Sequence, residues 1–466
     1  MLFSSLSFLY VFLPIVLLLY IVSPRKLKNS TILLASLVFY AWGEPKYVIL
    51  MVASILLGYV FGLLIEKLQK GKLRNAMLAL SVIVSLGMLG YFKYADFFID
   101  NFNKATGLSV PFLKVSLPIG ISFYTFQMLS YEIDVWREDV KAQRNLINLA
   151  AYISMFPQLI AGPIVRYKDV AEQLETRTHS LEKISDGILR FTVGLGKKVL
   201  LANTLGEISK VFGASGNQTV LFSWLYAAAV ALQIYFDFSG YSDMAIGLGS
   251  IMGFTFPENF NYPYTSKSVT EFWRRWHMTL GGWFRDYLYI PLGGNRVKEL
   301  RWFFNIFVVW MATGFWHGAS WNFVLWGLYF AILLILEKKF LGKYLKEAKV
   351  WNHIYLVLLI VVSFVIFDNT DMAQGAHRLA IMFGLSGAKF SSVESVFYLK
   401  DYCFILLVSM IGATSLPKRA VLRIKKTAAG AKVMDVLEPV FIAVLLLVCT
   451  AFLVNGSFNP FLYFRF

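Results

Sequence analysis

Long apolar stretches recur along the chain and are separated by short polar breaks. A helix needs about 20 mostly apolar residues to cross a bilayer. The pattern therefore predicts an all-α polytopic membrane protein with about eleven transmembrane helices. The expected spans are 5–22, 30–43, 46–65, 75–93, 146–164, 219–236, 302–317, 320–337, 354–368, 402–416 and 436–455.

Three further apolar segments, 115–131, 188–203 and 242–256, are shorter or broken by Gly or Pro. Irregular backbone at membrane depth is tolerated only where protein or a water-filled cavity surrounds it. We therefore expect these segments to form re-entrant or interfacial helices that border a functional site.

The composition supports a membrane protein, because 58% of the 466 residues are hydrophobic and only 15% are charged. Soluble domains average about 25% charged residues. The polar segment 165–187 is too short to fold alone, and we see no internal repeat. We treat 1–466 as a single membrane domain, with N-terminal helices in 1–110, a core in 111–330 and C-terminal helices in 331–466.

The net charge of +16 comes with Lys and Arg clustered in short loops such as 23–29 and 67–74. Such loops are typical of the cytoplasmic side, where they face anionic lipid. The orientation rule places the N-terminus and residues 94–107 outside. The lipid bilayer thus accounts for the basic charge, and we expect no nucleic-acid partner.

The usual soluble-enzyme motifs are absent from the sequence. Cys403 and Cys449 both lie in apolar runs and provide neither a disulfide framework nor a thiolate metal site. No HExxH, CxxC, GxSxG or complete phosphate-binding loop occurs. We expect no metal and no cofactor.

His317 lies in "TGFWHGASWN" (313–322), where one apolar run ends and another begins. An ionisable residue at membrane depth usually has a function. Burial disfavours the charged imidazolium, and a neutral imidazole can act as a general base. The alternative is a structural histidine bonded between helices. The small neighbours that allow close backbone approach are Gly314, Gly318, Ala319 and Ser320.

His277 lies in "EFWRRWHMTLGGWFRDYLYIPLGG" (271–294). Helical spacing predicts one amphipathic helix at the cytoplasmic interface, with His277 on its apolar face. There His277 is either a functional residue or an amphipathic side chain that only packs among the tryptophans. The predicted apolar face contains Trp273, Trp276, His277, Leu280, Trp283, Phe284 and Tyr287.

Carboxylates also lie near apolar runs, at Asp134, Asp237 and Asp243. Two of them fall within "YFDFSGYSDMAIG" (235–247). This stretch predicts either a polar break at the end of a helix, satisfied by its own hydroxyls, or the wall of a cavity.

These blocks together resemble the membrane-bound O-acyltransferase (MBOAT) family. The resemblance is carried by "NFNYPYTSKSVTEFWRRWHMTLGGWFRDYLYIPLGGNR", "GFWHGASWNFVLWGLY" and "FDFSGYSDMAIG". It extends to 33–47, 117–131, 156–167, 194–203 and the closing "NPFLYFRF" (459–466). The sequence is most similar to the bacterial branch, whose members include the alginate O-acetyltransferase membrane subunit and the protein that D-alanylates teichoic acids.

The resemblance implies a helical enzyme with a central funnel. It implies that His317 is the conserved histidine deep in that funnel and that His277 is the second motif histidine, so both are catalytic candidates. The arginines near His277 would meet phosphates of the acyl donor, or alternatively lipid phosphates. The residues implied to line the cavity or bind substrate are Trp276, Arg275, Trp316, Asp237, Ser239, Tyr241, Asn322 and Arg285.

The resemblance also implies the reaction. An acyl group, most simply acetyl, would come from a cytoplasmic thioester, either acetyl-CoA or a carrier-protein thioester. It would reach hydroxyls of an extracytoplasmic cell-surface polysaccharide through a secreted or membrane-anchored partner protein. The expected location is the bacterial cytoplasmic (inner) membrane. The alternatives are D-alanyl transfer to teichoic acid, O-acylation of lipid or protein, and a transporter without chemistry.

Overall fold

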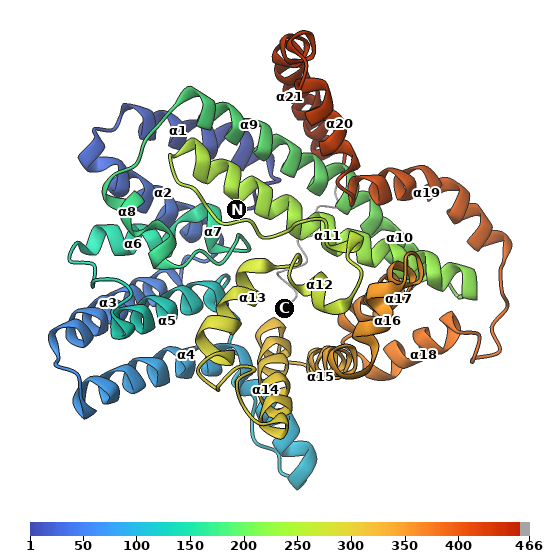
Figure 1. Ribbon diagram of the computed structural model, residues 1–466, viewed down its shortest axis with the longest axis horizontal. Coiled ribbons are helices and arrows are strands. Elements are labelled where there is room, and N and C mark those ends of the chain that lie inside the picture. The colour runs from blue at the N-terminus through green and yellow to red at the C-terminus, as the bar shows by residue number, and fades with distance from the viewer. Residues whose placement is uncertain (457–466) are drawn as a thin grey trace. The chain divides into compact units, whose positions relative to one another are not determined.

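The computed structural model describes residues 1–456 (Figure 1). This part of the chain consists of helices and connecting turns and contains no strand. The all-α prediction is therefore confirmed. The closing "NPFLYFRF" (459–466), which contributed to the family resemblance, lies outside the described residues.

Six helices in the described part are long and apolar enough to cross a membrane. They are α3 (Val48–Lys67), α4 (Lys72–Thr106), α11 (Val220–Ile251), α17 (Trp351–Asp368), α19 (Val393–Gly412) and α21 (Ala428–Asn455). Other apolar helices do not meet both conditions; α2 and α15, for example, have only 16 residues each. A polytopic protein is confirmed, whereas the number of crossings and the funnel stay predictions.

The chain forms two compact units. Unit 1 contains Met1–Phe191 and Ser242–Pro257, and unit 2 contains Thr192–Tyr241 and Glu258–Phe466. The boundary falls inside α9 (Leu181–Gly196) and α11, so these helices contribute to both units. The division of a single domain at 110 and 330 stays a prediction.

In unit 1, α5 packs against α3 and α4, and α6 packs against α2. At roughly 1.5 Å per residue, the 35-residue α4 is about 50 Å long, which exceeds the ~30 Å hydrocarbon core of a bilayer. The unit also contains the first part of α9 and the last part of α11. Its other elements are a π-helical turn (Phe8–Phe12), α1 (Leu13–Val22), a 3₁₀ turn (Arg25–Leu27), α2 (Lys28–Gly43), α5 (Ile121–Arg137), α6 (Leu146–Ser154), α7 (Phe156–Leu159) and α8 (Tyr167–Glu175).

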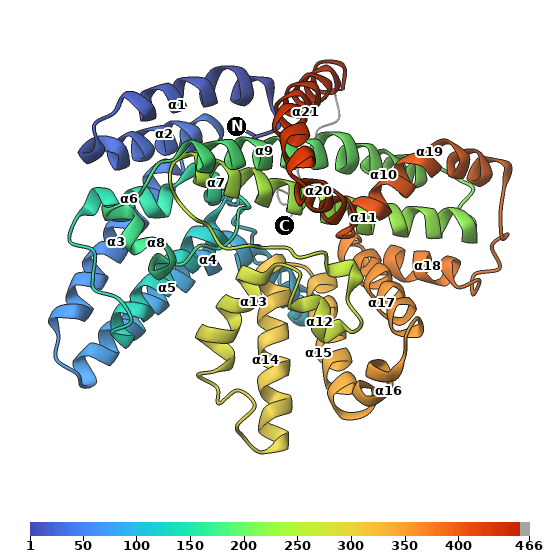
Figure 2. The ribbon, with the colours of Figure 1, turned by 45° about the horizontal axis from the view of Figure 1, so that its top comes forward.

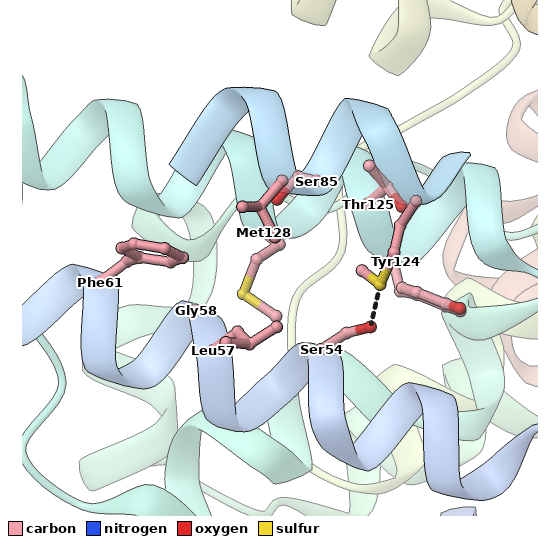
Figure 3. A pocket seen from close by; sticks show the side chains of 10 residues that line it. Ser54, Leu57, Gly58, Phe61, Ser85, Tyr124, Thr125 and Met128 are labelled. Atoms are coloured by element: carbon pink, nitrogen blue, oxygen red, sulfur yellow. Dashed lines mark hydrogen bonds between the residues drawn. The ribbon is translucent and has the colours of Figure 1, made fainter. Parts of the chain in front are cut away.

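A small cavity lies among α3, α4 and α5 (Figure 3). Ser54, Tyr124 and Met128 are among the residues that line it, and the Ser54 hydroxyl donates to the sulfur of Met88 at 3.8 Å. The free volume of about 10 Å³ has room for about one water molecule. This cavity is too small for an acyl donor or a sugar, so we do not assign it to substrate.

Unit 2 contains both motif histidines and most of the large aromatic core. Its elements after α9 are a π-helical turn (Lys197–Ala202), α10 (Asn203–Ala214), most of α11, a 3₁₀ turn (Pro263–Thr265), α12 (Val269–Trp273), α13 (Met278–Phe284), a π-helical turn (Arg285–Tyr289), α14 (Glu299–His317), α15 (Trp321–Leu336), a π-helical turn (Glu337–Leu341), α16 (Gly342–Glu347), α17, α18 (Met372–Met382), α19, α20 (Leu416–Lys425) and α21.

Helices α14 and α15 lie side by side as a tight hairpin (Figures 1 and 2). A Cβ on Gly314 would collide with the carbonyl oxygen of Phe323, and one on Gly327 would collide with that of Trp310. A Cβ on Gly318 would collide with the ring of Phe323. The predicted close backbone approach around His317 is confirmed. It holds His317, the last residue of α14, against the start of α15.

The predicted single amphipathic helix over 271–294 is wrong. Helix α12 ends at Trp273 and α13 begins at Met278, and His277 between them has a left-handed backbone with φ +43°. Hydrogen bonds from a distant segment hold this break, because Met278 N–H donates to Asn259 O and Asn261 N–H donates to Arg275 O. Most of the predicted apolar face is nevertheless buried, including His277 itself.

Of the two alternatives for 235–247, the polar helix break is wrong, because α11 continues through it. The cavity wall stays a prediction. The segment's carboxylates are paired instead. Within unit 2, Lys198 Nζ lies 2.6 Å from an Asp237 oxygen, and within unit 1, Arg190 lies 3.0 Å from Asp243. Ion pairing lets the helix retain acidic residues without ending.

Candidate active site

The two motif histidines share one tryptophan. The ring centroid of Trp316 lies 5.7 Å from that of His277 and 5.0 Å from that of His317. Both histidines are buried, with His277 1% and His317 7% exposed. The sequence separates the two residues, but the fold brings them into one aromatic setting.

Among the described residues, the His277 ring is hydrogen-bonded through only one of its two nitrogens. Its Nδ1 lies 3.0 Å from Oδ1 of Asn259, and its ring meets Phe238 of α11 edge-on with centroids 4.6 Å apart. Its Nε2 is buried and has no hydrogen-bond partner among the described residues. One ring nitrogen is therefore held by the protein, while the other has no partner within residues 1–456.

His277 lies outside the six candidate spans. Burial lowers the pKa of this imidazole well below its usual value, and nearby His317 lowers the pKa further. A neutral imidazole carries one N–H donor and one lone pair. His277 therefore has the protonation state that proton or hydrogen-bond acceptance requires.

His317 is surrounded by aromatic rings. Besides Trp316, its ring meets Trp326 at 5.1 Å and Phe367 at 5.3 Å between centroids. Both of these rings are buried, and Trp326 comes from α15 while Phe367 comes from α17. The environment of His317 is thus largely apolar, as expected for a general base that must stay neutral.

Asn322 lies close to this setting. Its Nδ2 donates to the carbonyl oxygens of Phe367 at 2.8 Å and Ile366 at 3.4 Å, which lie at the end of α17. Its Oδ1 is buried without a partner in the described part of the chain. The amide thus ties α15 to α17 and keeps one acceptor atom available.

The implied cavity residues on α11 have different surroundings. Asp237 forms a buried ion pair with Lys198, in which the side chains are 2% and 3% exposed. The pair joins α11 to the π-helical turn Lys197–Ala202, within the segment 188–203 that was predicted to be irregular. Ser239 and Tyr241 are each 2% exposed, and the Ser239 hydroxyl has no partner within residues 1–456.

The remaining predicted site residues differ in how exposed their side chains are. Trp276 is buried in the aromatic core and stacks on Phe272 at 5.4 Å. Arg275 is partly exposed and pairs with Glu271 at 2.6 Å. Arg285 is exposed and pairs with the adjacent Asp286. The two arginines are accessible to an anionic group, whereas Trp276 supports the turn that carries His277.

Two supporting residues were missed by the sequence analysis. One is Asn259, which holds His277. The other is Glu337, which is 3% exposed and accepts from Val269 N–H at 2.6 Å and from Thr270 N–H at 2.8 Å. Glu337 thereby caps the start of α12, the helix that leads to His277. Only the "NFNYPY" block that carried the family resemblance pointed to the Asn259 region, and no signal pointed to Glu337.

A metal centre is not formed by the described residues, because no group of three or more His, Cys, Asp and Glu side chains lies together there. The chemistry available to the site is that of two buried imidazoles in an aromatic environment. Such groups accept protons and hydrogen bonds, and exclusion of water protects a reactive acyl compound from hydrolysis.

Comparison with known proteins agrees with this chemistry. A model of the membrane-bound O-acyltransferase family matches residues 51–367. The "Probable alginate O-acetylase AlgI" of Azotobacter vinelandii is 40% identical over 501 aligned positions, covering 100% of both chains. The peptidoglycan O-acetyltransferase of Helicobacter pylori is 34% identical over 83% of this chain and 80% of its own.

A further relative is the teichoic acid D-alanyltransferase of Bacillus subtilis, which is 31% identical over 53% of this chain and 65% of its own. The family match includes both histidine blocks, and the resemblance inferred from them is confirmed. The chain therefore belongs to the membrane-bound O-acyltransferase family and is a multi-pass membrane O-acyltransferase.

Proposed function

We propose that this enzyme transfers an acetyl group from a cytoplasmic thioester to hydroxyl groups of a polysaccharide outside the bacterial cytoplasmic membrane. The observation that carries the proposal is the pair of buried histidines that share Trp316. The choice of acetyl and polysaccharide is supported by the names of the relatives, which are an alginate O-acetylase and a peptidoglycan O-acetyltransferase.

His317 is the general base in this proposal. It removes the proton from the acceptor hydroxyl while the oxygen attacks the acyl carbon. The carbon–sulfur bond then breaks, and the thiolate leaves with the proton that His317 took up. The products are an ester and a free thiol, so atoms and charges balance without a metal or redox cofactor.

The aromatic surroundings of His317 support this role. Rings of Trp316, Trp326 and Phe367 lie within 5.3 Å of its ring between centroids. Such a setting excludes water and so limits hydrolysis of the thioester. General-base catalysis of this kind contributes about 10²- to 10⁴-fold in rate.

The donor is a thioester of coenzyme A or of a carrier protein, and both carry phosphate. Arg274, Arg275 and Arg285 lie near the His277 turn in sequence; Arg274 and Arg285 are exposed, and Arg275 is partly exposed. Guanidinium groups match phosphate geometry well. We assign them to the donor's phosphates, and a secreted or membrane-anchored partner to the final delivery onto the polysaccharide.

The test uses the full chain purified in detergent. Acetyl-CoA and an oligosaccharide acceptor are supplied, with and without the candidate partner protein, and free thiol and acetylated sugar are measured. Thiol release that depends on His317 and an acetyl mass increment on the sugar support the proposal. Absence of thiol release with every thioester donor tested would reject an acyltransfer role.

Mass spectrometry of surface glycans from cells with and without the gene identifies the product. Loss of acetyl groups supports the proposal. Loss of D-alanyl esters instead, or loss of acylation from a lipid or protein only, would replace it with the corresponding alternative.

A further inference from the structure

The side-chain oxygen of Asn259 meets three groups of the His277 turn. Its Oδ1 accepts from the Thr279 hydroxyl at 2.9 Å and from the Thr279 backbone N–H at 3.3 Å, and it lies 3.0 Å from Nδ1 of His277. A backbone N–H can only donate, so the atom that faces it must be the amide oxygen and not the amide nitrogen. The orientation of the Asn259 amide is thereby fixed by chemistry.

The same oxygen determines which ring nitrogen of His277 carries the proton. An oxygen acceptor 3.0 Å from Nδ1 requires Nδ1 to carry the proton. In the neutral ring, Nε2 then carries the lone pair. The large majority of buried side-chain polar atoms have hydrogen-bond partners, yet Nε2 of this 1%-exposed residue has none among residues 1–456.

We infer that Asn259 is a positioning residue that locks His277 as the Nδ1–H tautomer, so that Nε2 accepts a hydrogen bond from an O–H or N–H group of the bound substrate. The inference rests on the proposed function and deepens it. A neutral His277 in this tautomer cannot donate to the thioester carbonyl. Nε2 of His277 can therefore only accept a hydrogen bond or a proton, and other groups must stabilise the carbonyl oxygen.

Two substrate groups have the required chemistry. One is the hydroxyl of the acceptor, which would contact His277 during transfer. The other is an amide N–H of the pantetheine arm of the donor, which would contact His277 while the donor is bound. The first contact acts on kcat and the second on the donor KM.

The backbone makes Asn259 unusually suitable for mutation. The turn at His277 has φ +43° and is held by the bond from Met278 N–H to the Asn259 carbonyl. Every amino acid at position 259 retains that carbonyl. An apolar side chain there removes the bond to Nδ1 but keeps the backbone bond that shapes the turn.

The first experiment measures kinetics of Asn259→Leu, Asn259→Asp and the matched control Thr279→Ala. Asn259→Leu removes the acceptor, and we expect kcat/KM to fall about 10- to 100-fold, the range known for partners that orient metal-bound histidine rings. Thr279→Ala removes a bond to the same oxygen and leaves His277 held, so the loss is about fivefold or less. Equal losses in the two variants would overturn the inference.

Asn259→Asp keeps an acceptor for Nδ1–H and adds a negative charge. The carboxylate raises the pKa of His277, and activity needs the neutral ring. The acid limb of the pH–rate profile therefore moves to higher pH while activity is retained above it. A profile that keeps its acid limb in place would contradict the assignment.

A simple acetyl thioester without pantetheine amides distinguishes the two possible partners of Nε2, the donor amide and the acceptor hydroxyl. If the donor amide binds Nε2, Asn259→Leu raises the KM for acetyl-CoA, and the effect disappears with the simple thioester. If the acceptor hydroxyl binds Nε2, kcat falls equally with both donors. Each pattern supports the inference and assigns the partner.

Histidine-labelled protein gives a readout that does not depend on activity. Nuclear magnetic resonance of the ring nitrogens reports the tautomer of His277, whose signal is identified by its loss in His277→Gln. We expect the Nδ1–H tautomer in the parent and a mixture in Asn259→Leu. An Nε2–H tautomer in the parent, or no change in the variant, would overturn the inference even if the proposed acetyl transfer is correct.

Discussion

Two buried polar regions of unit 2 are organised in opposite ways. On α11, Asp237 is paired with Lys198 at 2.6 Å, and both side chains are almost fully buried. Around the α14–α15 hairpin and the His277 turn, His277 and Asn322 each use one polar atom in a protein hydrogen bond and leave the other without a described partner. We call the Asp237–Lys198 pair the closed region, because its charges pair with each other. We call the surroundings of His277 and Asn322 the open region, because acceptor atoms there have no described partner.

This difference separates structure from function. A buried polar atom without a partner costs about 1–3 kcal/mol, and a ligand or a water molecule can supply the missing partner. A buried ion pair needs no ligand. Asp237 entered as a cavity residue through the family resemblance, but its pairing indicates that it acts mainly through the fold, whereas His277 and Asn322 remain candidates for substrate contact.

The largest expected effect comes from His317→Gln. If His317 is the general base, turnover falls about 10²- to 10⁴-fold, because glutamine keeps polarity and approximate size but cannot take up the proton. The measurement is acetyl transfer by purified protein, with thermal unfolding as the control for folding. A correctly folded variant that transfers acetyl as fast as the parent would remove His317 from the mechanism.

Lys198→Met tests the closed region. It leaves Asp237 buried without its partner, which costs about 3–5 kcal/mol of stability. The double variant Lys198→Met with Asp237→Leu replaces the pair by apolar groups and should recover most of that loss. Thermal unfolding of the detergent-solubilised protein measures both.

The neighbouring Lys197 provides the control for this pair, because it is partly exposed. Lys197→Met should lower the unfolding temperature less than Lys198→Met. If the double variant instead folds well but loses all transfer activity, then Asp237 takes part in the reaction and the contrast between the two regions fails.

The sequence predicted features that depend on neighbouring residues. The apolar runs indicated helices, and small residues around His317 predicted the close approach of two helices that Gly314 and Gly327 now show. Both features depend on residues that are close together in the sequence, so the sequence pattern alone can predict them. The identity of the two histidine candidates came from long motif blocks, and the structure adds that they share Trp316.

The wrong predictions concern features decided by distant residues. Helical periodicity continues across His277, so the pattern alone gave one helix; the break is held by Asn259, 18 positions away. Likewise, the polar residues of 235–247 left a helix break open as one of two alternatives. The helix continues there, and the partners of Asp237 and Asp243, Lys198 and Arg190, come from a distant part of the sequence. Pairing across elements cannot be derived from local spacing.

Glu337→Leu tests how the open region is supported. Glu337 accepts from Val269 N–H, Thr270 N–H and the Thr270 hydroxyl. Hydrogen bonds to a charged group are worth about 1.5–3 kcal/mol. We expect a loss of stability in this range, together with lower turnover because α12 positions the His277 turn.

Glu337→Gln is the matched variant, since its amide oxygen still accepts from the start of α12. It should retain most of the stability and activity that Glu337→Leu loses. The comparison uses unfolding temperature and kcat in parallel. If Glu337→Leu has the stability and turnover of the parent, the cap does not support the site.

The smallest expected effect is that of Arg275→Ala on donor binding. Arg275 is partly exposed, pairs with Glu271 at 2.6 Å and donates to the Thr265 hydroxyl at 3.2 Å. An exposed ion pair contributes only about 0.2–1 kcal/mol to stability. If the guanidinium meets donor phosphate, Arg275→Ala raises the KM for acetyl-CoA up to about 10-fold and changes kcat little.

Glu271→Gln distinguishes this role from lipid anchoring. It releases Arg275 from its carboxylate, so a phosphate-binding Arg275 would bind the donor equally well or better, and the KM would stay the same or fall. Raising the salt concentration should increase the KM of the parent more than that of Arg275→Ala, because screening acts on the charge that the variant lacks. If Arg275→Ala lowers kcat and leaves the donor KM unchanged, Arg275 belongs with Trp276 and Glu337 among the residues that shape the turn, and the open region recognises its donor through other groups.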